Sequence, residues 1–247
     1  MATGSAVQRR LIELVGLPGS GKSSLGSAMM ASESLHEIGV VPIERLVYRG
    51  LGRSGRLRFQ ANAHVRHRQL ATTGYRMCVG ASHAHVAGAR LVPGLLVDTE
   101  RLRHAERQLA DGEVGVFAQG PIQQLRSLIT IGGDRSNTRL DTAVAEIEAA
   151  VASSTRWTIV ALDVASEVAS ARIAGRASNS GRYDRMDPDH RREVLTSEAL
   201  AQDKILAVLN RLEGCDVLRI DGEMRPGAAL SAVETGLRSV VQGAPSR

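Results

Sequence analysis

A glycine-rich loop at residues 16–23 constrains the fold of this chain more than any other feature. The loop fits the pattern Gly-x-x-x-x-Gly-Lys-[Ser/Thr], which occurs once, and it follows an apolar, strand-like run at residues 11–15. A segment with helical spacing begins directly after it, at Ser23. Glycines let the backbone wrap closely around an anion, and the N-terminal end of a helix adds positive charge. The pattern therefore predicts a strand, a phosphate-binding loop and a helix in succession.

The loop also predicts how the phosphates of a nucleoside triphosphate are held together with Mg²⁺. Lys22 would reach the β- and γ-phosphates, and the Ser23 hydroxyl would bind the metal ion. Lys22 is one of only two lysines, although lysine and arginine together number 31, and a compact ammonium suits such a loop better than a planar guanidinium. The predicted nucleotide-binding residues are Gly16, Leu17, Pro18, Gly19, Ser20, Gly21, Lys22, Ser23, Ser24 and Arg172.

The rest of the chain alternates predicted strands with predicted helices, which favours an α/β fold of three layers around a five-stranded, mostly parallel sheet. Strands are expected at residues 11–15, 40–48, 114–118, 157–164 and 217–220. Helices are expected at residues 23–35, 98–110, 122–131, 138–151, 166–177, 188–212 and 227–241, with a weaker helical pattern over 60–87 and a turn at Pro93-Gly94. A length of 247 residues suits a single domain, 1–247.

Composition counts against several classes of protein. Aromatic residues make up only 2% of the chain, which leaves few platforms for stacking nucleic-acid bases. No apolar run approaches the roughly 20 residues of a membrane span, and the N-terminus lacks the pattern of a signal peptide. The two cysteines have no spacing for zinc or a redox pair. We therefore expect a cytoplasmic protein without membrane or nucleic-acid partners, and a homodimer remains open.

Four arginines follow the strand predicted at residues 157–164. Arg172 and Arg176 share one face of a helix, and Arg182 and Arg185 lie in the polar segment beyond it. Arginines on a closing lid stabilise the negative charge that spreads over a transferring phosphoryl group, and the lid excludes water. We therefore expect an arginine-rich lid at residues 175–190, with Lys22, Arg176, Arg182 and Arg185 as catalytic residues. The alternative is a solvated basic helix followed by a surface loop.

The order of these features resembles the nucleoside-monophosphate kinases, and within that group the thymidylate kinases. The resemblance is carried by the glycine loop, a strand ending in Leu162-Asp163-Val164, the helix with Arg172 and Arg176, the segment Arg182-Tyr183-Asp184-Arg185, and residues 217–222. It covers residues 11–35 and 157–240 and is poor over 45–112. The resemblance implies a P-loop NTPase fold of the kinase type, with adenine bordered by the loop after the last strand.

One position departs from the thymidylate kinases. Where they carry Asp-Arg at the end of the third strand, and the arginine helps to hold the acceptor, this chain has Ala118-Gln119. The acceptor is therefore left open, although Gln119 would still hydrogen-bond a neutral one. Asp98 is the other candidate acid: it either caps the helix expected at 98–110 or follows a short strand as a Walker-B-like carboxylate.

Residues 45–112 are expected to form a helical insertion that holds the acceptor. The segment is rich in arginine and histidine, and Arg45, Arg49, Asp98 and Gln119 are the residues expected to contact the acceptor. The histidine pairs at 64/67 and 83/85 have spacings that a metal site would use, although no cysteine or carboxylate cluster accompanies them. A solvated helical face is the third interpretation of this segment.

The sequence thus predicts an ATP-dependent phosphotransferase that moves the γ-phosphoryl group of ATP to a small molecule, with ATP and Mg²⁺ as cofactors. No Asn-Lys-x-Asp motif for guanine and no Leu-Ser-Gly-Gly-Gln transporter motif occurs. One alternative is a nucleotide-dependent switch of the ATPase or GTPase type that contacts a partner through residues 45–112. The other is modification of nucleic-acid ends, which would need a basic track on the surface.

Overall fold

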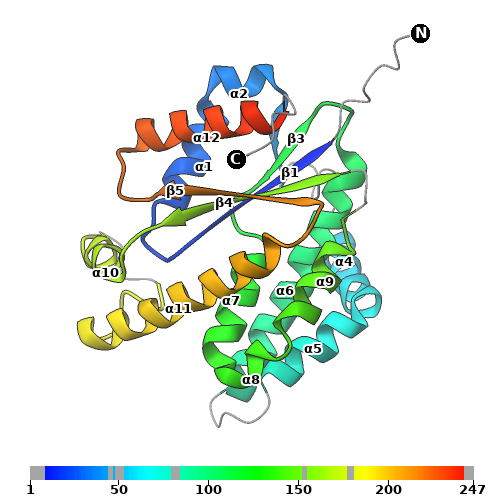
Figure 1. Ribbon diagram of the computed structural model, residues 1–247. Helices are drawn as coiled ribbons and strands as arrows, with labels where there is room; N and C mark the ends of the chain where they lie inside the picture. The colour runs from blue at the N-terminus through cyan, green and yellow to red at the C-terminus, as the bar shows by residue number, and fades with distance from the viewer. Residues whose placement is uncertain are drawn as a thin grey trace.

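The central strand, β1 (Arg10–Gly16), is buried along its whole length, and it organises the sheet. The computed structural model describes residues 9–43, 47, 53–78, 84–151, 155–176 and 181–241. The other strands are β2 (Val40–Pro42), β3 (Val114–Phe117), β4 (Arg156–Asp163) and β5 (Cys215–Asp221). They lie in the order β2-β3-β1-β4-β5, and every neighbouring pair is parallel (Figure 1). The predicted five-stranded parallel sheet is confirmed.

Helices cover both faces of this sheet and complete the three layers (Figure 1). One face carries α1 (Lys22–Ala31), α2 (Glu33–Glu37) and α12 (Pro226–Val241). The other carries α6 (Ala84–Gln108), α7 (Pro121–Gly132), α9 (Leu140–Glu148) and α11 (Pro188–Leu209). The remaining helices are α4 (Arg53–Arg66), α5 (Arg68–Cys78), α8 (Asp134–Asn137) and α10 (Ser166–Ala174).

Alternation along β1 assigns its side chains to two separate cores. Leu11 and Val15 join the larger core beneath α6, α7 and α11, whereas Ile12 and Leu14 join the core beneath α1 and α12. This period of two is what a strand buried on both faces requires. Glu13 shares a face with Leu11 and Val15, so its carboxyl group points to the side of α7.

The largest correction concerns α6. The turn expected at Pro93-Gly94 and the helix start expected at Asp98 are wrong, because α6 runs without a break from Ala84 to Gln108 and contains Pro93. Asp98 therefore neither caps a helix nor ends a strand. A proline inside a helix removes one backbone hydrogen bond. Burial of Val92, Leu95 and Leu96 against the core offsets that loss.

Other boundaries also differ from the sequence-based expectation; the helix expected at 166–177, for example, ends at Ala174 as α10. The strand expected at residues 40–48 has three residues, ending at Pro42, whose missing N–H suits a strand end. The single helix expected at 23–35 is interrupted at Ser32, whose hydroxyl accepts a hydrogen bond from the Leu35 N–H and so caps α2. Within the described residues, no helix has both the length and the apolar character that crossing a membrane requires.

Candidate active site

The glycine loop lies where β1 ends and α1 begins, as its sequence predicts. Gly19 and Gly21 have φ values of +86° and +95°, in the region that only glycine adopts without strain. A Cβ atom at Gly19 would also lie 2.6 Å from the carbonyl oxygen of Ala169. The backbone at Gly21 faces open space, since an added Cβ there would meet no atom within 4 Å. The loop thus leaves room for an anion at the N-terminus of α1.

Lys22 is the buried cation of this loop. Its Nζ donates hydrogen bonds to the carbonyl oxygens of Gly16 at 2.5 Å and Leu17 at 2.9 Å, and the residue is only 9% exposed. Burial lowers the pKa of Lys22 to about 7, with Arg126 and Arg176 acting in the same direction and Glu198 opposing them. Negative charge placed beside Nζ would reverse this effect, because it favours the protonated amine.

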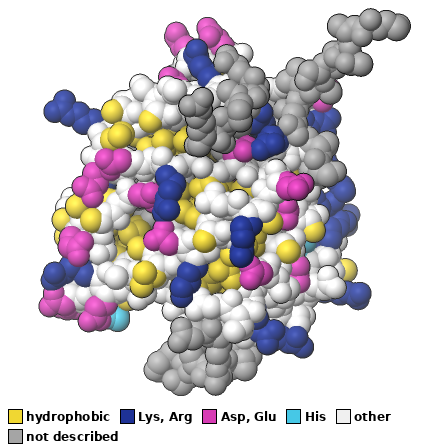
Figure 2. Space-filling model, viewed as in Figure 1, with side chains coloured by type: hydrophobic (Ala, Val, Ile, Leu, Met, Phe, Trp, Pro, Cys, Tyr) yellow, Lys and Arg dark blue, Asp and Glu magenta, His cyan; other side chains and the backbone are white. Residues whose placement is uncertain are grey.

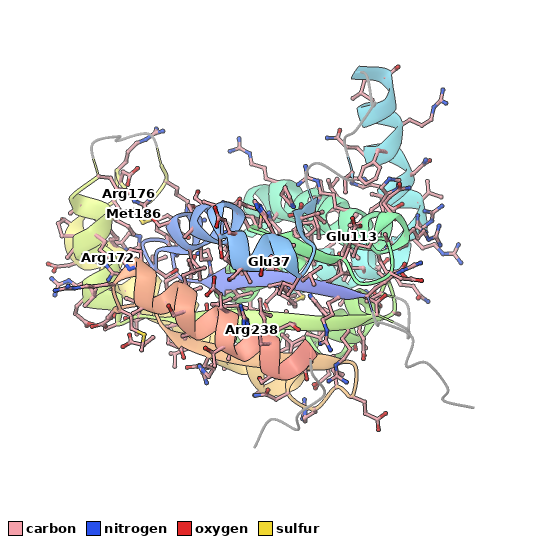
Figure 3. The ribbon with its side chains drawn as sticks, turned by 90° about the horizontal axis from the view of Figure 1, so that it is seen from above. Glu37, Glu113, Arg172, Arg176, Met186 and Arg238 are labelled. Atoms are coloured by element: carbon pink, nitrogen blue, oxygen red, sulfur yellow. The ribbon has the colours of Figure 1, made fainter. Side chains whose placement is uncertain are left out.

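A cavity of about 800 Å³ opens over the loop. It is lined by loop residues 17–24, by Gln119 and Gln123 after β3, by Arg172 and Arg176 of the α10 region, by Tyr183, and by Gly222 and Met224 after β5. Arg172 and Arg176 lie together at one end of the molecule (Figure 3). Arg172 is fixed there because its Nη1 donates a hydrogen bond of 2.7 Å to the carbonyl oxygen of Gly222. The structure thus brings both arginines to the phosphate loop, although Arg176 lies two residues beyond the end of α10 and not on the helix as expected.

The other two predicted lid arginines lie differently. The Arg182 guanidinium stacks over the ring of Tyr183 at 4.6 Å and donates to the Tyr183 hydroxyl at 2.9 Å. Arg185 is exposed on the same turn. In the described part of this turn, residues 181–186, Tyr183 is the member that lines the cavity. Residues 177–180 of the predicted lid lie outside the described residues.

A second cavity of about 390 Å³ lies against α4 and α6. Its lining comes from Gln60 and His64 of α4, from residues 93, 94, 97, 98 and 101 of α6, and from Gln119 and Gln124. Gln119 lines both cavities. Asp98 is buried at its wall, where it accepts hydrogen bonds from Arg101 at 2.9 Å and from the Gln124 amide at 3.2 Å.

The structure thus joins two of the four predicted acceptor residues, Asp98 and Gln119, at one cavity. Arg45 and Arg49 lie outside the described residues. Gln124 is a polar wall residue that the sequence did not single out, since only the packing of α6 against α7 places it opposite Asp98. His64 bonds to the Gln60 carbonyl oxygen, and His67 to Glu100. No group of three or more metal-ligating side chains occurs among the described residues, and His83 lies outside them.

Glu13 is a buried acid that sequence reasoning also missed. Its Oε1 accepts hydrogen bonds from the backbone N–H groups of Ile122 at 2.9 Å and Gln123 at 3.3 Å, at the start of α7. Burial raises the pKa of Glu13 well above its usual range, although both N–H groups oppose the shift. A Cβ at Gly120 would lie 2.5 Å from the Glu13 carboxyl carbon, so a side chain at this position would displace the Glu13 carboxyl group. The sequence did contain a signal for this buried acid, namely a charged residue inside the apolar run at residues 11–15.

Comparison with known proteins finds similarity in the fold but no matching sequence family. No family model matches the chain, and no curated protein matches it. A solved structure of deoxyadenosine kinase from M. mycoides with bound dATP matches 93% of this chain and 100% of its own, with a TM-score of 0.51 and 13% sequence identity. The fold is therefore that of a P-loop kinase. This match does not distinguish the thymidylate kinases from other kinases with this fold.

Proposed function

We propose that this protein is an ATP-dependent phosphotransferase that moves the γ-phosphoryl group of ATP to a small-molecule acceptor. The observation that carries the proposal is that Gln119 lines two cavities, one over the phosphate loop and one against α4 and α6. A transfer reaction needs its donor and acceptor side by side with water excluded. Such paired cavities suit a kinase better than a protein that only hydrolyses its nucleotide.

The donor would be held by the loop amides and by protonated Lys22. The Ser23 hydroxyl lines the cavity at the start of α1, which is where an oxygen ligand for Mg²⁺ is needed beside the phosphates. When bound, Mg²⁺ would neutralise charge between the β- and γ-phosphates. Arg176 would stabilise the transferring group, while Arg172, anchored on Gly222, would hold the nucleotide in place.

The acceptor would occupy the second cavity, where its hydroxyl and amino groups would bond to carboxamides and a carboxylate. Gln119, Gln124 and Asp98 supply these groups, and Arg101 on the same wall is already paired with Asp98. This lining favours a neutral polar acceptor over a phosphorylated one. The structural neighbour is a deoxyadenosine kinase, so nucleosides are the first acceptors to try.

The lid remains part of the proposal. Residues 175–190 would close over the donor and bring Arg182 and Arg185 to the γ-phosphate, and residues 45–112 would frame the acceptor. Lids of this kind exclude water and complete the site on binding. Closure would make transfer to the acceptor faster than hydrolysis of ATP.

The test is ATP turnover with and without a panel of nucleosides, nucleoside monophosphates and sugars. The proposal expects one neutral acceptor to stimulate turnover by about tenfold or more. Stimulation by a protein partner alone would instead favour the switch, whose supporting observation is that no described residue lining the phosphate cavity is a carboxylate. Nucleic-acid modification is less well supported, because basic and acidic side chains are interspersed on the face shown in Figure 2.

A further inference from the structure

We propose that Glu198 is a positioning residue that links the phosphate loop to the turn at residues 181–186, through Arg126 on one side and Tyr183 on the other. The inference rests on the proposed nucleotide binding at the loop. It adds a role for three residues that come from α7, α11 and the turn after α10. None of the three belongs to the glycine loop itself.

The first link joins Glu198 to the loop. Glu198 is 0% exposed, and its Oε2 lies 3.3 Å from Nη2 of the buried Arg126. Nη1 of Arg126 donates a hydrogen bond to the carbonyl oxygen of Gly16, the oxygen that also accepts from Lys22. Two cations therefore share one acceptor behind the loop. Glu198 supplies the negative charge that lets them coexist, since an unpaired buried charge is strongly destabilising.

The second link joins Glu198 to the turn. Its other oxygen, Oε1, accepts a hydrogen bond from the Tyr183 hydroxyl and lies 3.4 Å from Nη2 of Arg182. Arg182 also stacks on the Tyr183 ring, so both side chains of the turn contact the same carboxylate and each other. Because Tyr183 lines the phosphate cavity, its position sets how closely the turn approaches the nucleotide. One carboxylate thus holds the loop with one oxygen and the turn with the other.

This arrangement has a consequence for Lys22. Lys22 and Arg126 donate to the same carbonyl oxygen of Gly16, and the Arg126 guanidinium faces the Glu198 carboxylate. Loss of that carboxylate would leave Arg126 buried without its anion, directly behind the backbone that positions Lys22. The affinity of the loop for phosphates would therefore fall.

The experiment uses the full chain with three variants: Glu198→Gln, Tyr183→Phe and the control Glu193→Gln. Glu193 lies on the same helix, its side chain is 80% exposed, and it contacts His190 at 3.7 Å. Binding of MgATP is measured by calorimetry at a single pH. Hydrogen exchange of residues 181–187 is measured with and without a non-hydrolysable ATP analogue. Melting temperatures establish that each variant is folded.

Glu198→Gln is expected to weaken MgATP binding by about tenfold and to lose the nucleotide-induced protection of residues 181–187, because it removes the charge that both links share. Tyr183→Phe is expected to retain its affinity for MgATP while losing the nucleotide-induced protection of residues 181–187. Glu193→Gln should match the unaltered protein in both measurements.

Two results would overturn the proposal. One is a folded Glu198→Gln variant whose affinity for MgATP is unchanged, or is reduced while residues 181–187 keep full protection, which is the signature of packing alone. The other, independent of how Glu198→Gln folds, is full protection of residues 181–187 in Tyr183→Phe. A protein that binds MgATP but phosphorylates no acceptor would remove the proposed function without affecting either measurement.

Discussion

The two cavities of this protein differ in the elements that build them and in the charge they present. The phosphate cavity lies at the carboxyl ends of parallel strands, with Lys22, Arg172 and Arg176 in its lining. The second cavity is built from the sides of α4, α6 and α7, and it presents carboxamides and the carboxylate of Asp98. The contrast indicates an anionic ligand in one and a neutral polar ligand in the other.

Because the phosphate cavity is the cationic one, Lys22→Met is the substitution expected to have the largest effect on phosphoryl transfer. Phosphoryl transfer should fall by about 10³-fold, because the variant loses a preorganised charge at the phosphates. The free energy of unfolding should not fall, since burial disfavours the charged amine in the folded protein. Steady-state kinetics and thermal unfolding measure the two effects. Retained transfer would remove the phosphate loop from the mechanism.

Arg176→Gln is expected to have the next largest effect. The residue lines the phosphate cavity, so kcat should fall by about 10²-fold while the affinity for ATP changes by less than about tenfold. The matched control is Arg211→Gln, because Arg211 is an exposed arginine that pairs with Asp141 on α9. A loss confined to ATP affinity would assign Arg176 to ground-state binding.

Asp98→Asn probes the second cavity in isolation. The variant keeps the volume of the side chain but loses its charge, so kcat/KM for the acceptor should fall by about tenfold to 100-fold. The KM for ATP should stay constant, since Asp98 lines the second cavity and not the first. An increase in the KM for ATP instead would contradict the separation of the two cavities.

The pH dependence of ATP affinity is the smallest expected effect. The pKa of Lys22 is lowered to about 7 in the structure, and bound phosphate would raise it again. The lysine is therefore mostly protonated below pH 7, and the affinity should be constant there. Above pH 7 binding must take up a proton, and the dissociation constant should rise by about tenfold per pH unit. Calorimetry on Lys22→Met, which should show no such slope, provides the control.

The parts of the molecule that depend on local chemistry could be predicted from the sequence, and the parts that depend on packing could not. The glycine loop and the strand at β1 follow from short-range requirements, namely backbone freedom and alternation, and both are found as expected. The passage of α6 through Pro93 depends on packing against the rest of the core, which local turn signals do not report. The same reason hid Gln124 and Glu198, whose partners Asp98, Arg126 and Tyr183 lie on other elements.

The most direct test of the account follows the γ-phosphate of ATP after incubation with the protein, Mg²⁺ and the acceptor that stimulates turnover. An isotopic label on the γ-phosphoryl group shows its destination by mass spectrometry of the products. The account expects the label on a hydroxyl of the neutral acceptor, and expects it to disappear from that product in Lys22→Met. Label found in inorganic phosphate, with the acceptor unmodified, would contradict it.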